Sequence, residues 1–390
     1  IHYSLLIIHC TSKGGGYTMK EFNYTGTCIP EKHYMVDLSN KIDKIVKLVE
    51  RGKYFTISKP RQYGKTTTLN LLERRLKDRY ILISFSLQEF GKESFKDIES
   101  FSRVIVSSIN DKIEKYNRDK KITLKDEVSN YKELSKIISE FILSMDKKTI
   151  LVIDEVDEAS NYELFSKFLG MLRNKYLEAA RDEDNTFYSV ILTGVHDIKN
   201  LKMEMKKNEE ISYNSPWNIA VKFNIDMSFS SEEIKTMLID YEKDHNIGMD
   251  ISLISKKLYN YTSGYPFLVS RLCSIIDEEL ERDFSQNELE EAIKIILNEN
   301  NTLFDDLIKN IERYKELYNL VERIVLDGEE INYNVQAHQL GIVYGIFKEK
   351  NKKLVIYNKI YEILLYNYMI AKREMKKGAV LTYKYKDEFV

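Results

Sequence analysis

The sequence is poor in the residues that break, bend or crosslink a chain. Its 390 residues include four prolines, fifteen glycines and three cysteines. So few prolines and glycines leave little room for disordered linkers. The cysteines, Cys10, Cys28 and Cys273, are odd in number and far apart, so they match neither a metal-ligand spacing nor a disulfide framework. This pattern favours the reducing environment of the cytoplasm.

A strong charge of one sign and a long apolar run are also missing. The formal net charge is −2 at pH 7, which excludes a general attraction to nucleic acid or anionic membranes and leaves only local patches. No apolar run reaches the length of about 18 residues that a membrane span needs, so we expect no membrane contact. The 43% of apolar residues is typical of a globular protein, and the length allows two or three domains.

The first eighteen residues do not read as part of the fold. The chain begins with Ile1, and its apolar start lacks the basic leader and small-residue cleavage site of a secretory signal. The segment "KGGGYTM" that ends at Met19 is what a purine-rich bacterial ribosome-binding site would encode if it were read in frame. We therefore expect Met19 to be the initiator and residues 1–18 to be a mistranslated upstream segment. N-terminal sequencing of the native protein would test this hypothesis.

Residues 19–228 alternate between strand and helix patterns. A continuous apolar run such as "TILVID" (149–154) is typical of a strand buried on both faces of a parallel sheet. Strands that alternate with helices predict an α/β domain with a parallel sheet and right-handed connections. The expected strands begin at residues 53, 80, 149, 187 and 218, and the expected helices cover 66–79, 95–145 with a polar interruption, and 161–182.

The pattern changes after residue 228. Helical periodicity opens with a serine cap and acidic residues, "SSEEIKTML", and continues to about residue 300, which predicts a helical lid over 229–300. Residues 301–375 read as helices, two alternating strands (342–347 and 353–358) and a helix from Lys359, an order that predicts a winged-helix-like domain. Residues 376–390 are left as a tail that could begin a further domain in a longer reading frame.

The stretch "ISKPRQYGKTTT" (57–68) follows a predicted strand and opens a predicted helix. A phosphate-binding loop works because consecutive backbone N–H groups surround the anion at a helix N-terminus. Gly64, Lys65 and Thr66 supply the second half of the G-x-x-x-x-G-K-[ST] pattern, with Lys65 for the phosphates and Thr66 for Mg²⁺. The position of the first glycine is taken by Lys59, and Pro60 pushes it toward extended geometry. On its own, the stretch could be an exposed turn before a helix.

Two acids follow a second predicted strand, in "ILVIDE" (150–155). Ligands bind at the carboxyl edge of open parallel sheets, so Asp154 is expected to hold Mg²⁺ and Glu155 to orient and deprotonate the attacking water. The alternative is a pair of solvated acids at the start of a helix. Both motifs in this order, on these elements, predict a site for ATP and Mg²⁺.

A family resemblance rests on residues 26–69. This stretch resembles the AAA-ATPase-like family of P-loop proteins, which is related to the signal-transducing STAND ATPases. Its members share a Y-x-V-D element, here residues 34–37, and a loop of the form R-P-R-x-x-G-K-[ST] with no first glycine, in which Lys59 replaces the usual arginine. The resemblance continues to about residue 370. It implies a P-loop ATPase whose nucleotide-binding loop comprises Lys59, Pro60, Arg61, Gln62, Tyr63, Gly64, Lys65, Thr66 and Thr67.

The resemblance implies three further assignments. The Y-x-V-D element would lie beside the adenine, with Tyr34, Val36 and Asp37 at the nucleotide; core packing is the alternative reading for this element. Gly264 and Pro266 of "SGYPFLVSRLC" would contact the base from the helical lid, unless they form an ordinary turn.

The third assignment concerns the terminal phosphate. Thr193, at the end of the strand "FYSVILTG", would sense this phosphate, and His196 is the alternative. Transition-state charge also needs a cation, for which Arg61 and Arg173 are the candidates; both could instead be structural ion-pair partners.

The function of the C-terminal region is more open. Many relatives carry a nuclease-like domain of the D…E-x-K type, but no matching pattern follows residue 300. The basic turn 348–353 and the cluster Lys372, Arg373, Lys376 and Lys377 leave contact with DNA or a protein partner open, as they do oligomerisation. Three functions are therefore considered: an Mg-dependent ATPase that moves its lid and winged helix, a slow ATP-dependent switch, and a DNA-binding regulator.

Overall fold

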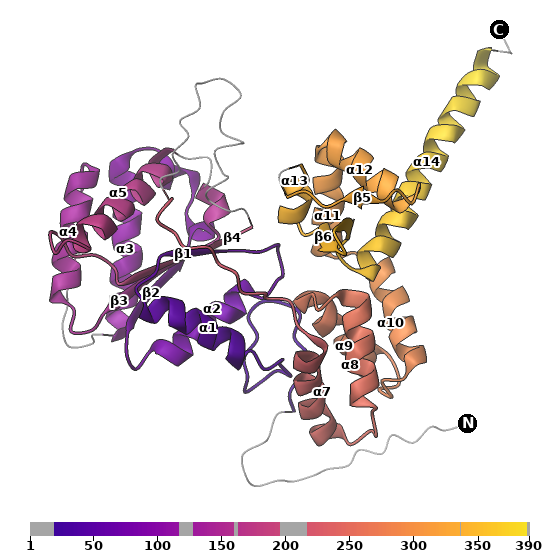
Figure 1. Ribbon diagram of the computed structural model, residues 1–390, viewed down its shortest axis with the longest axis horizontal. Helices are drawn as coiled ribbons and strands as arrows, with labels where there is room; N and C mark the ends of the chain where they lie inside the picture. Colours follow the sequence, from indigo (N-terminus) through magenta and orange to yellow (C-terminus); the bar gives the residue numbers. More distant parts are fainter. Residues whose placement is uncertain (1–18, 117–127, 160–162, 196–216, 336, 388–390) are drawn as a thin grey trace, which may run out of the picture.

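The computed structural model describes residues 19–116, 128–159, 163–195, 217–335 and 337–387. It contains an α/β lobe, a group of lid helices and a mixed C-terminal lobe from which the last helix projects (Figure 1). Residues 1–18, for which an upstream origin is predicted, and Cys10 lie outside the described residues, as does His196. In the described residues, no helix combines the length and the apolar character that crossing a bilayer requires.

The α/β lobe is built on a parallel sheet, as the sequence predicts. Its strands lie in the order β1-β4-β3-β2 and are all parallel, so their carboxyl ends share one edge. The strands are β1 (Phe55–Ser58), β2 (Ile81–Ser86), β3 (Thr149–Asp154) and β4 (Ser189–Gly194). The helices are α1 (Ser39–Glu50), α2 (Lys65–Leu76), α3 (Ile98–Tyr116), α4 (Tyr131–Ser144) and α5 (Glu163–Ala179), with short 3₁₀ turns η1 (Leu87–Glu89), η2 (Lys92–Phe95) and η3 (Val156–Ala159).

Both faces of this sheet are covered. Along β3, Ile150 and Val152 belong to the apolar cluster that includes α1 and α2, whereas Leu151 and Ile153 belong to the cluster that includes α3, α4 and α5. Figure 1 shows these two helix groups on opposite sides of the sheet. The alternation explains why the strand reads as an unbroken apolar run, since each side chain meets a helix on one face or the other.

The prediction of a fifth strand over 218–225 is wrong. Only Val221 joins the sheet, through a bridge beside Phe55 in which the Val221 N–H donates to the carbonyl of Tyr54 at 2.9 Å. Phe223 instead stacks on Phe55 with ring centroids 5.9 Å apart. Aromatic packing therefore holds this segment against the edge strand where the apolar alternation suggested a ladder of backbone hydrogen bonds.

Four helices form the lid region: α7 (Ser231–His245), α8 (Ile251–Thr262), α9 (Pro266–Glu279) and α10 (Gln286–Asn298). The predicted serine cap is present at Ser230, where a capping box pairs its side chain with the N–H of Glu233 and returns the carboxylate of Glu233 to the N–H of Ser230. Pro266 occupies the first turn of α9, where a missing N–H has no cost.

The C-terminal lobe combines helices with a small antiparallel sheet in a winged-helix-like order. The strands lie in the order β5-β7-β6. The elements are α11 (Thr302–Arg313), α12 (Lys315–Val325), β5 (Ile331–Asn332), α13 (Gln339–Val343), β6 (Phe347–Lys350), β7 (Lys353–Ile356) and α14 (Lys359–Asp387). The helix from Lys359 is confirmed, and it continues through most of the stretch that was predicted to be a tail.

The predicted strand over 342–347 is wrong for most of its length, because α13 occupies its start. The helix ends at Val343, and Gly345, two residues later, has a φ of +69° that permits a Schellman cap. The N–H of Ile346 donates to the carbonyl of Gly341 at 2.8 Å, and the N–H of Gly345 donates to the carbonyl of Ile342 at 3.1 Å. An alternating apolar pattern was thus misread, since a glycine at the cap had already turned the chain.

Candidate functional site

The stretch 57–68 forms a turn between the end of β1 and the start of α2. Gly64 has φ +75° and precedes the first residue of α2, a left-handed conformation that glycine adopts without steric cost. Lys65 is the first helical residue and is only 6% exposed. Its ammonium donates to the carbonyls of Lys59 and Pro60, each at 3.1 Å. The loop therefore wraps around the lysine at a helix N-terminus, where the helix dipole favours an anion.

Asp154 ends β3 and fixes three groups around itself. The hydroxyl of Thr66 donates to Oδ2 at 3.3 Å, and the hydroxyl of Thr193 donates to Oδ1. The N–H of Glu155 also donates to Oδ1, at 2.9 Å. The structure thus brings the predicted metal ligands Thr66 and Asp154 together. Thr193 is fully buried behind them on β4, where it orients the carboxylate.

Glu155 leaves the strand in a left-handed conformation, with φ +52°. Such a conformation costs free energy for a non-glycine residue and is concentrated at functional sites. Burial raises the pKa of the Glu155 carboxyl, against the opposing effect of the nearby Lys65. Burial likewise lowers the pKa of the Lys65 ammonium, against the opposing charges of Glu155, Asp157 and Asp154. The lysine and the acids therefore interact electrostatically in one partly desolvated site.

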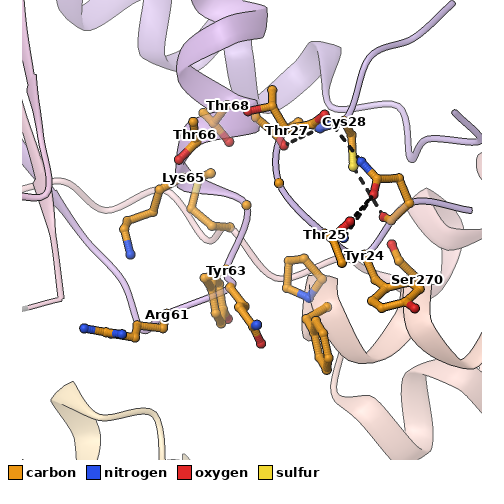
Figure 2. Close-up of a pocket in the computed structure, with 18 of the residues that line it drawn as sticks. Tyr24, Thr25, Thr27, Cys28, Arg61, Tyr63, Lys65, Thr66, Thr68 and Ser270 are labelled. Atoms are coloured by element: carbon orange, nitrogen blue, oxygen red, sulfur yellow. Dashed lines mark hydrogen bonds between the residues drawn. The ribbon is translucent and has the colours of Figure 1, made fainter. Parts of the chain in front are cut away.

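A cavity of about 630 Å³ opens beside the loop. It is bounded by residues 23–28, here called the strap, by the loop 61–68, by the start of α9 and by the connection 299–302. Figure 2 shows Thr27 and Cys28 of the strap beside Thr66 and Thr68 at the start of α2. The N–H of Cys28 donates to the hydroxyl of Thr67 at 3.1 Å, so the strap is tied directly to the helix that follows the loop.

The two ends of this cavity differ in chemistry. Lys65 and Arg61 extend to one side of the loop, whereas Tyr24 and Ser270 lie on the other side (Figure 2). Glu155 is at the charged end, and apolar side chains line the rest of the cavity: Val36, Met227, Phe229, Met237, Pro266 and Phe267. A charged end and an apolar end suit a ligand that joins phosphates to a flat base.

The residues of the Y-x-V-D element separate in the structure. Tyr34 and Val36 line the cavity, but Tyr34 is 2% exposed and its hydroxyl donates to Asp244 at 2.9 Å. Asp37 lies outside this cavity and accepts the N–H of Ser39, the first residue of α1, at 2.9 Å. The element thus joins the cavity wall, the lid and the first helix.

The lid motif separates in a similar way. Pro266 lines the cavity and approaches the position that a side chain at Gly64 would occupy. Gly264 does not line it; a Cβ there would lie 1.8 Å from the carbonyl oxygen of Phe229. The motif therefore brings the lid against the loop through its proline, while its glycine permits close packing inside the lid.

The candidate arginines take different positions. Arg61 lies at the charged end, with its side chain 64% exposed, and pairs with Asp306 of α11 at 3.4 Å. Arg173 donates to the side-chain oxygen of Asn218 at 2.7 Å and lines neither this cavity nor the smaller one beside Glu155. Arg61 thus forms an ion pair, as its alternative reading expects, and also lines the cavity, whereas Arg173 bonds a neutral amide away from both cavities.

The lid and the C-terminal lobe hold the middle of the loop. The hydroxyl of Tyr265 donates to the carbonyl of Arg61 at 2.5 Å. The side-chain amide of Gln62 donates to the hydroxyl of Thr302 at 3.0 Å, at the start of α11. Gln62 itself has φ +55°, so a strained loop residue is fixed by a partner from another lobe.

Tyr63 and Pro60 extend these contacts. The buried Tyr63 shares a hydrogen bond between hydroxyls with Tyr357, next to β7. Burial raises the pKa of both phenols. A Cβ at Gly345 would lie 2.6 Å from the ring of Pro60, so the backbone of the C-terminal lobe packs against the loop without an intervening side chain.

Sequence reasoning missed several parts of this site. The strap, the connection 299–302 and Ser270 carry no motif, although Ser270 lies four residues after Pro266 on α9 and so faces the same way. The contacts between Tyr63 and Tyr357, or Gln62 and Thr302, join residues about 240 to 290 positions apart, and no local pattern indicates such pairs.

Comparison with known proteins agrees with this geometry. Residues 31–367 match the family described as AAA-like domain. The Walker-type ATPase PABY2304 of Pyrococcus abyssi is similar in structure, with TM-score 0.61 and 14% identity over 88% of this chain and 99% of that chain. At this identity, the likeness establishes the fold.

Two further solved structures are less similar. The ORC2 protein of Aeropyrum pernix, in its ADPNP–ADP complexes, has TM-score 0.46 and 12% identity over 90% of this chain and 99% of that chain. Cdc6p of Pyrobaculum aerophilum has TM-score 0.41 and 13% identity over 90% and 97%. No curated protein matches the sequence. Because the family match spans most of the chain and the loop, the acids and the sheet edge all meet at one cavity, this protein belongs to the AAA-like domain family of P-loop ATPases.

Proposed function

We propose that this protein is an Mg-dependent ATP hydrolase that couples its nucleotide state to the lid and the C-terminal lobe. One observation carries the proposal: the ammonium of Lys65, the Thr66–Asp154 pair and the carboxylate of Glu155 meet at one end of a cavity whose other end is apolar. This arrangement suits the phosphates at the first end and the base at the second.

The hydrolytic step uses Glu155 as the base. Its carboxylate accepts a proton from water, and the water oxygen forms a bond to the terminal phosphorus. The bond from that phosphorus to the bridging oxygen breaks, and its electron pair leaves with ADP. Burial raises the pKa of Glu155, which brings a glutamate closer to the pH range in which a base accepts and releases protons efficiently. Lys65 would neutralise charge on the phosphates.

Thr66 and Asp154 fit Mg²⁺. Their oxygens lie 3.3 Å apart at the phosphate end, and magnesium prefers oxygen ligands, commonly one or two carboxylates together with phosphates and water. The ion would arrive with the nucleotide, because Mg²⁺ is commonly held by one or two carboxylates together with substrate phosphates. When bound, Mg²⁺ would neutralise phosphate charge. The second oxygen of Asp154 is held by Thr193 and by the N–H of Glu155, which fixes the direction of the free lone pairs.

The coupling is supported by the contacts on the loop. Three successive residues, Arg61, Gln62 and Tyr63, each contact the lid or the C-terminal lobe through a hydrogen bond. A loop that shifts when it closes on phosphates would therefore displace those partners. The basic residues considered for DNA contact are partly engaged elsewhere: Lys372 pairs with Glu312 at 2.7 Å, and Arg373 pairs with Glu322 at 3.0 Å.

Steady-state hydrolysis by wild type and Glu155→Gln tests the proposal. The glutamine keeps the shape of the side chain and cannot accept the proton, so kcat should fall about 10²- to 10⁴-fold while ATP still binds in calorimetry. Glu163→Gln, an exposed acid at the start of α5, is the control and should keep the wild-type rate. A wild-type rate that is negligible and unchanged by Glu155→Gln would favour the slow switch. Absence of ATP binding would contradict both functions.

A further inference from the structure

A second, smaller cavity of about 210 Å³ adjoins the first at its charged end. Arg61, Glu155 and Glu158 line both cavities. The second cavity continues from these residues to Asp157 and to Val195, just beyond β4. The second cavity therefore lies beside the proposed base, away from the apolar part of the first cavity. The terminal phosphate and the attacking water would be placed on this side of Glu155.

The wall opposite Glu155 is one face of α11. Asp306, Asn310 and Arg313 line the second cavity, and their spacing of four and then three residues places them on one side of a helix. This helix belongs to the C-terminal lobe, more than 100 positions after the acids in the sequence. The fold thus brings three polar side chains of α11 to the cavity of the catalytic acid, beside Leu303 and Leu307 of the same helix.

The two arginines of this cavity are in different states. Arg61 is paired with Asp306 at 3.4 Å. Arg313 is exposed, and in the part of the chain that the structure describes no carboxylate lies within ion-pair distance of it. Its guanidinium carbon lies 5.4 Å from the centroid of the ring of its neighbour Tyr314. Arg313 is thus a cation available to an anion in the cavity.

The charges of the cavity indicate what that anion needs. Four carboxylates line it, those of Glu155, Asp157, Glu158 and Asp306, so a terminal phosphate would meet repulsion there unless a cation balanced it. Lys65 approaches from the loop on the other side. An arginine placed across from the base can neutralise the charge that spreads over the transferring phosphoryl group, a role that can be supplied within the same chain.

We propose that Arg313 is the transition-state arginine of this ATPase and that the C-terminal lobe supplies it in cis. This inference rests on the proposed function and adds the residue that sequence reasoning could not locate. It also makes the C-terminal lobe part of the catalytic site, because α11 must stay against the loop for Arg313 to face Glu155. The ion pair between Arg61 and Asp306 holds α11 at that position.

Arg313→Ala and Arg313→Lys test the inference against Lys309→Ala, which removes an exposed cation from the same helix outside both cavities. Hydrolysis is measured at steady state. Calorimetry measures the affinity for ADP, for ATP and for ADP with aluminium fluoride, which mimics the transferring phosphoryl group. Arg313→Ala should lower kcat about 10³-fold and lose most of the tighter binding of the mimic, while the affinity for ADP stays within about twofold. Arg313→Lys should recover little of the wild-type kcat or of the tighter binding of the mimic, because lysine cannot make the bidentate contacts to phosphate that arginine makes.

Unchanged ADP affinity also confirms that the variant is folded. The inference is overturned if Arg313→Ala matches Lys309→Ala in kcat and in affinity for the mimic. Failure of the proposed function is distinguishable, because the wild type would then bind neither ADP nor ATP. If the wild type binds ATP and hydrolyses it too slowly to measure, the preference for the mimic over ADP decides, and its survival in Arg313→Ala overturns the inference.

Discussion

The two halves of the phosphate-binding loop make different contacts. The trailing half, Gly64–Thr66, holds the groups that serve a nucleotide: a left-handed glycine, a buried ammonium and a hydroxyl beside Asp154. The leading half, residues 59–63, contacts β4, the lid and the C-terminal lobe. One half is built for a ligand and the other for the rest of the protein.

This difference explains the missing first glycine. Lys59 donates its N–H to the carbonyl of Gly194 at 3.0 Å, so the loop enters as an extension of the sheet, as a residue before proline prefers. Lys65 joins the two halves, because its ammonium holds the carbonyls of Lys59 and Pro60. The ammonium of Lys65 must release those carbonyls when it turns toward a phosphate. Ligand binding by the trailing half should therefore weaken or shift the contacts of the leading half.

The largest expected effect comes from the trailing half. Lys65→Ala should weaken ATP binding about 10- to 100-fold, because hydrogen bonds to charged groups contribute about 1.5–3 kcal/mol and about 1.4 kcal/mol is a factor of ten. The hydrolysis rate should fall further, since phosphate charge increases toward the transition state. Titration calorimetry and steady-state rates measure the two effects.

Lys77→Ala is the matched control, an exposed lysine that follows the last turn of the same helix. It should bind ATP as the wild type does. Equal affinities in the two variants would mean that the ammonium of residue 65 serves the loop carbonyls alone, and the division between the halves would then be wrong.

A smaller effect should come from the contact between the leading half and the C-terminal lobe. A Cβ at Gly345 would lie 2.6 Å from Pro60, and overpacking of this kind costs about 1–3 kcal/mol. Gly345→Ala should therefore lower the free energy of unfolding, measured in denaturant. Gly328→Ala is the control, because Gly328 has a similar φ of +65° and nothing within 4 Å of the added Cβ. Equal losses of unfolding free energy in the two variants would mean that the cost comes from the left-handed backbone conformation and not from the contact with Pro60.

The fold was largely predictable because its signals are local. Buried parallel strands leave continuous apolar runs, and the first turn of α7 leaves a serine and acids, so these elements were found close to their true ends. The errors have a common cause. The segment around Val221 and the segment before Phe347 both alternate as strands do, but aromatic stacking on Phe55 and a Schellman cap at Gly345 decide their conformation. Tertiary contacts and cap geometry overrode the pattern.

The candidate site was predictable in its trailing half alone. Lys65 and Thr66 follow β1 through the loop, and Asp154 and Glu155 end and follow β3. The carboxyl ends of these two parallel strands share one sheet edge on either side of β4, so topology alone brings the four residues together. Arg313 could not be found this way. Its approach to the acids depends on how the C-terminal lobe packs on the loop, which is set by side chains distant in sequence and by no spacing within either segment.

The hydroxyl pair between the leading half and the C-terminal lobe allows a finer measurement. Tyr63→Phe and Tyr357→Phe remove one hydroxyl each and keep the buried rings. The double-mutant cycle should give a coupling of about 0.5–1.5 kcal/mol in the unfolding of the nucleotide-free protein, the usual contribution of one hydrogen bond. The coupling should decrease when ATP is present, if the loop moves as it binds. Strict additivity without nucleotide would show that the two hydroxyls do not stabilise each other.

The smallest expected effect tests whether the leading half acts on the chemistry at all. Arg61 lowers the pKa of Glu155 through charge, but less than Lys65 does, and its side chain is 64% exposed, so solvent screens it. Removing this positive charge favours the protonated acid, so in Arg61→Ala the pKa of Glu155 should rise further. Because Glu155 must be ionised to accept a proton, the acid limb of kcat/KM should move slightly to higher pH, and more so at low ionic strength.

Arg61→Lys keeps the positive charge and should leave the limb in place, which would attribute the shift in Arg61→Ala to the loss of that charge. A limb that moves to lower pH in Arg61→Ala would contradict the assignment of Glu155 as the base, because loss of a cation cannot stabilise a carboxylate. A fall in kcat as large as that of Arg313→Ala would show that the leading half takes part in the chemistry, either through the charge of Arg61 itself or through the ion pair with Asp306 that holds α11 in place.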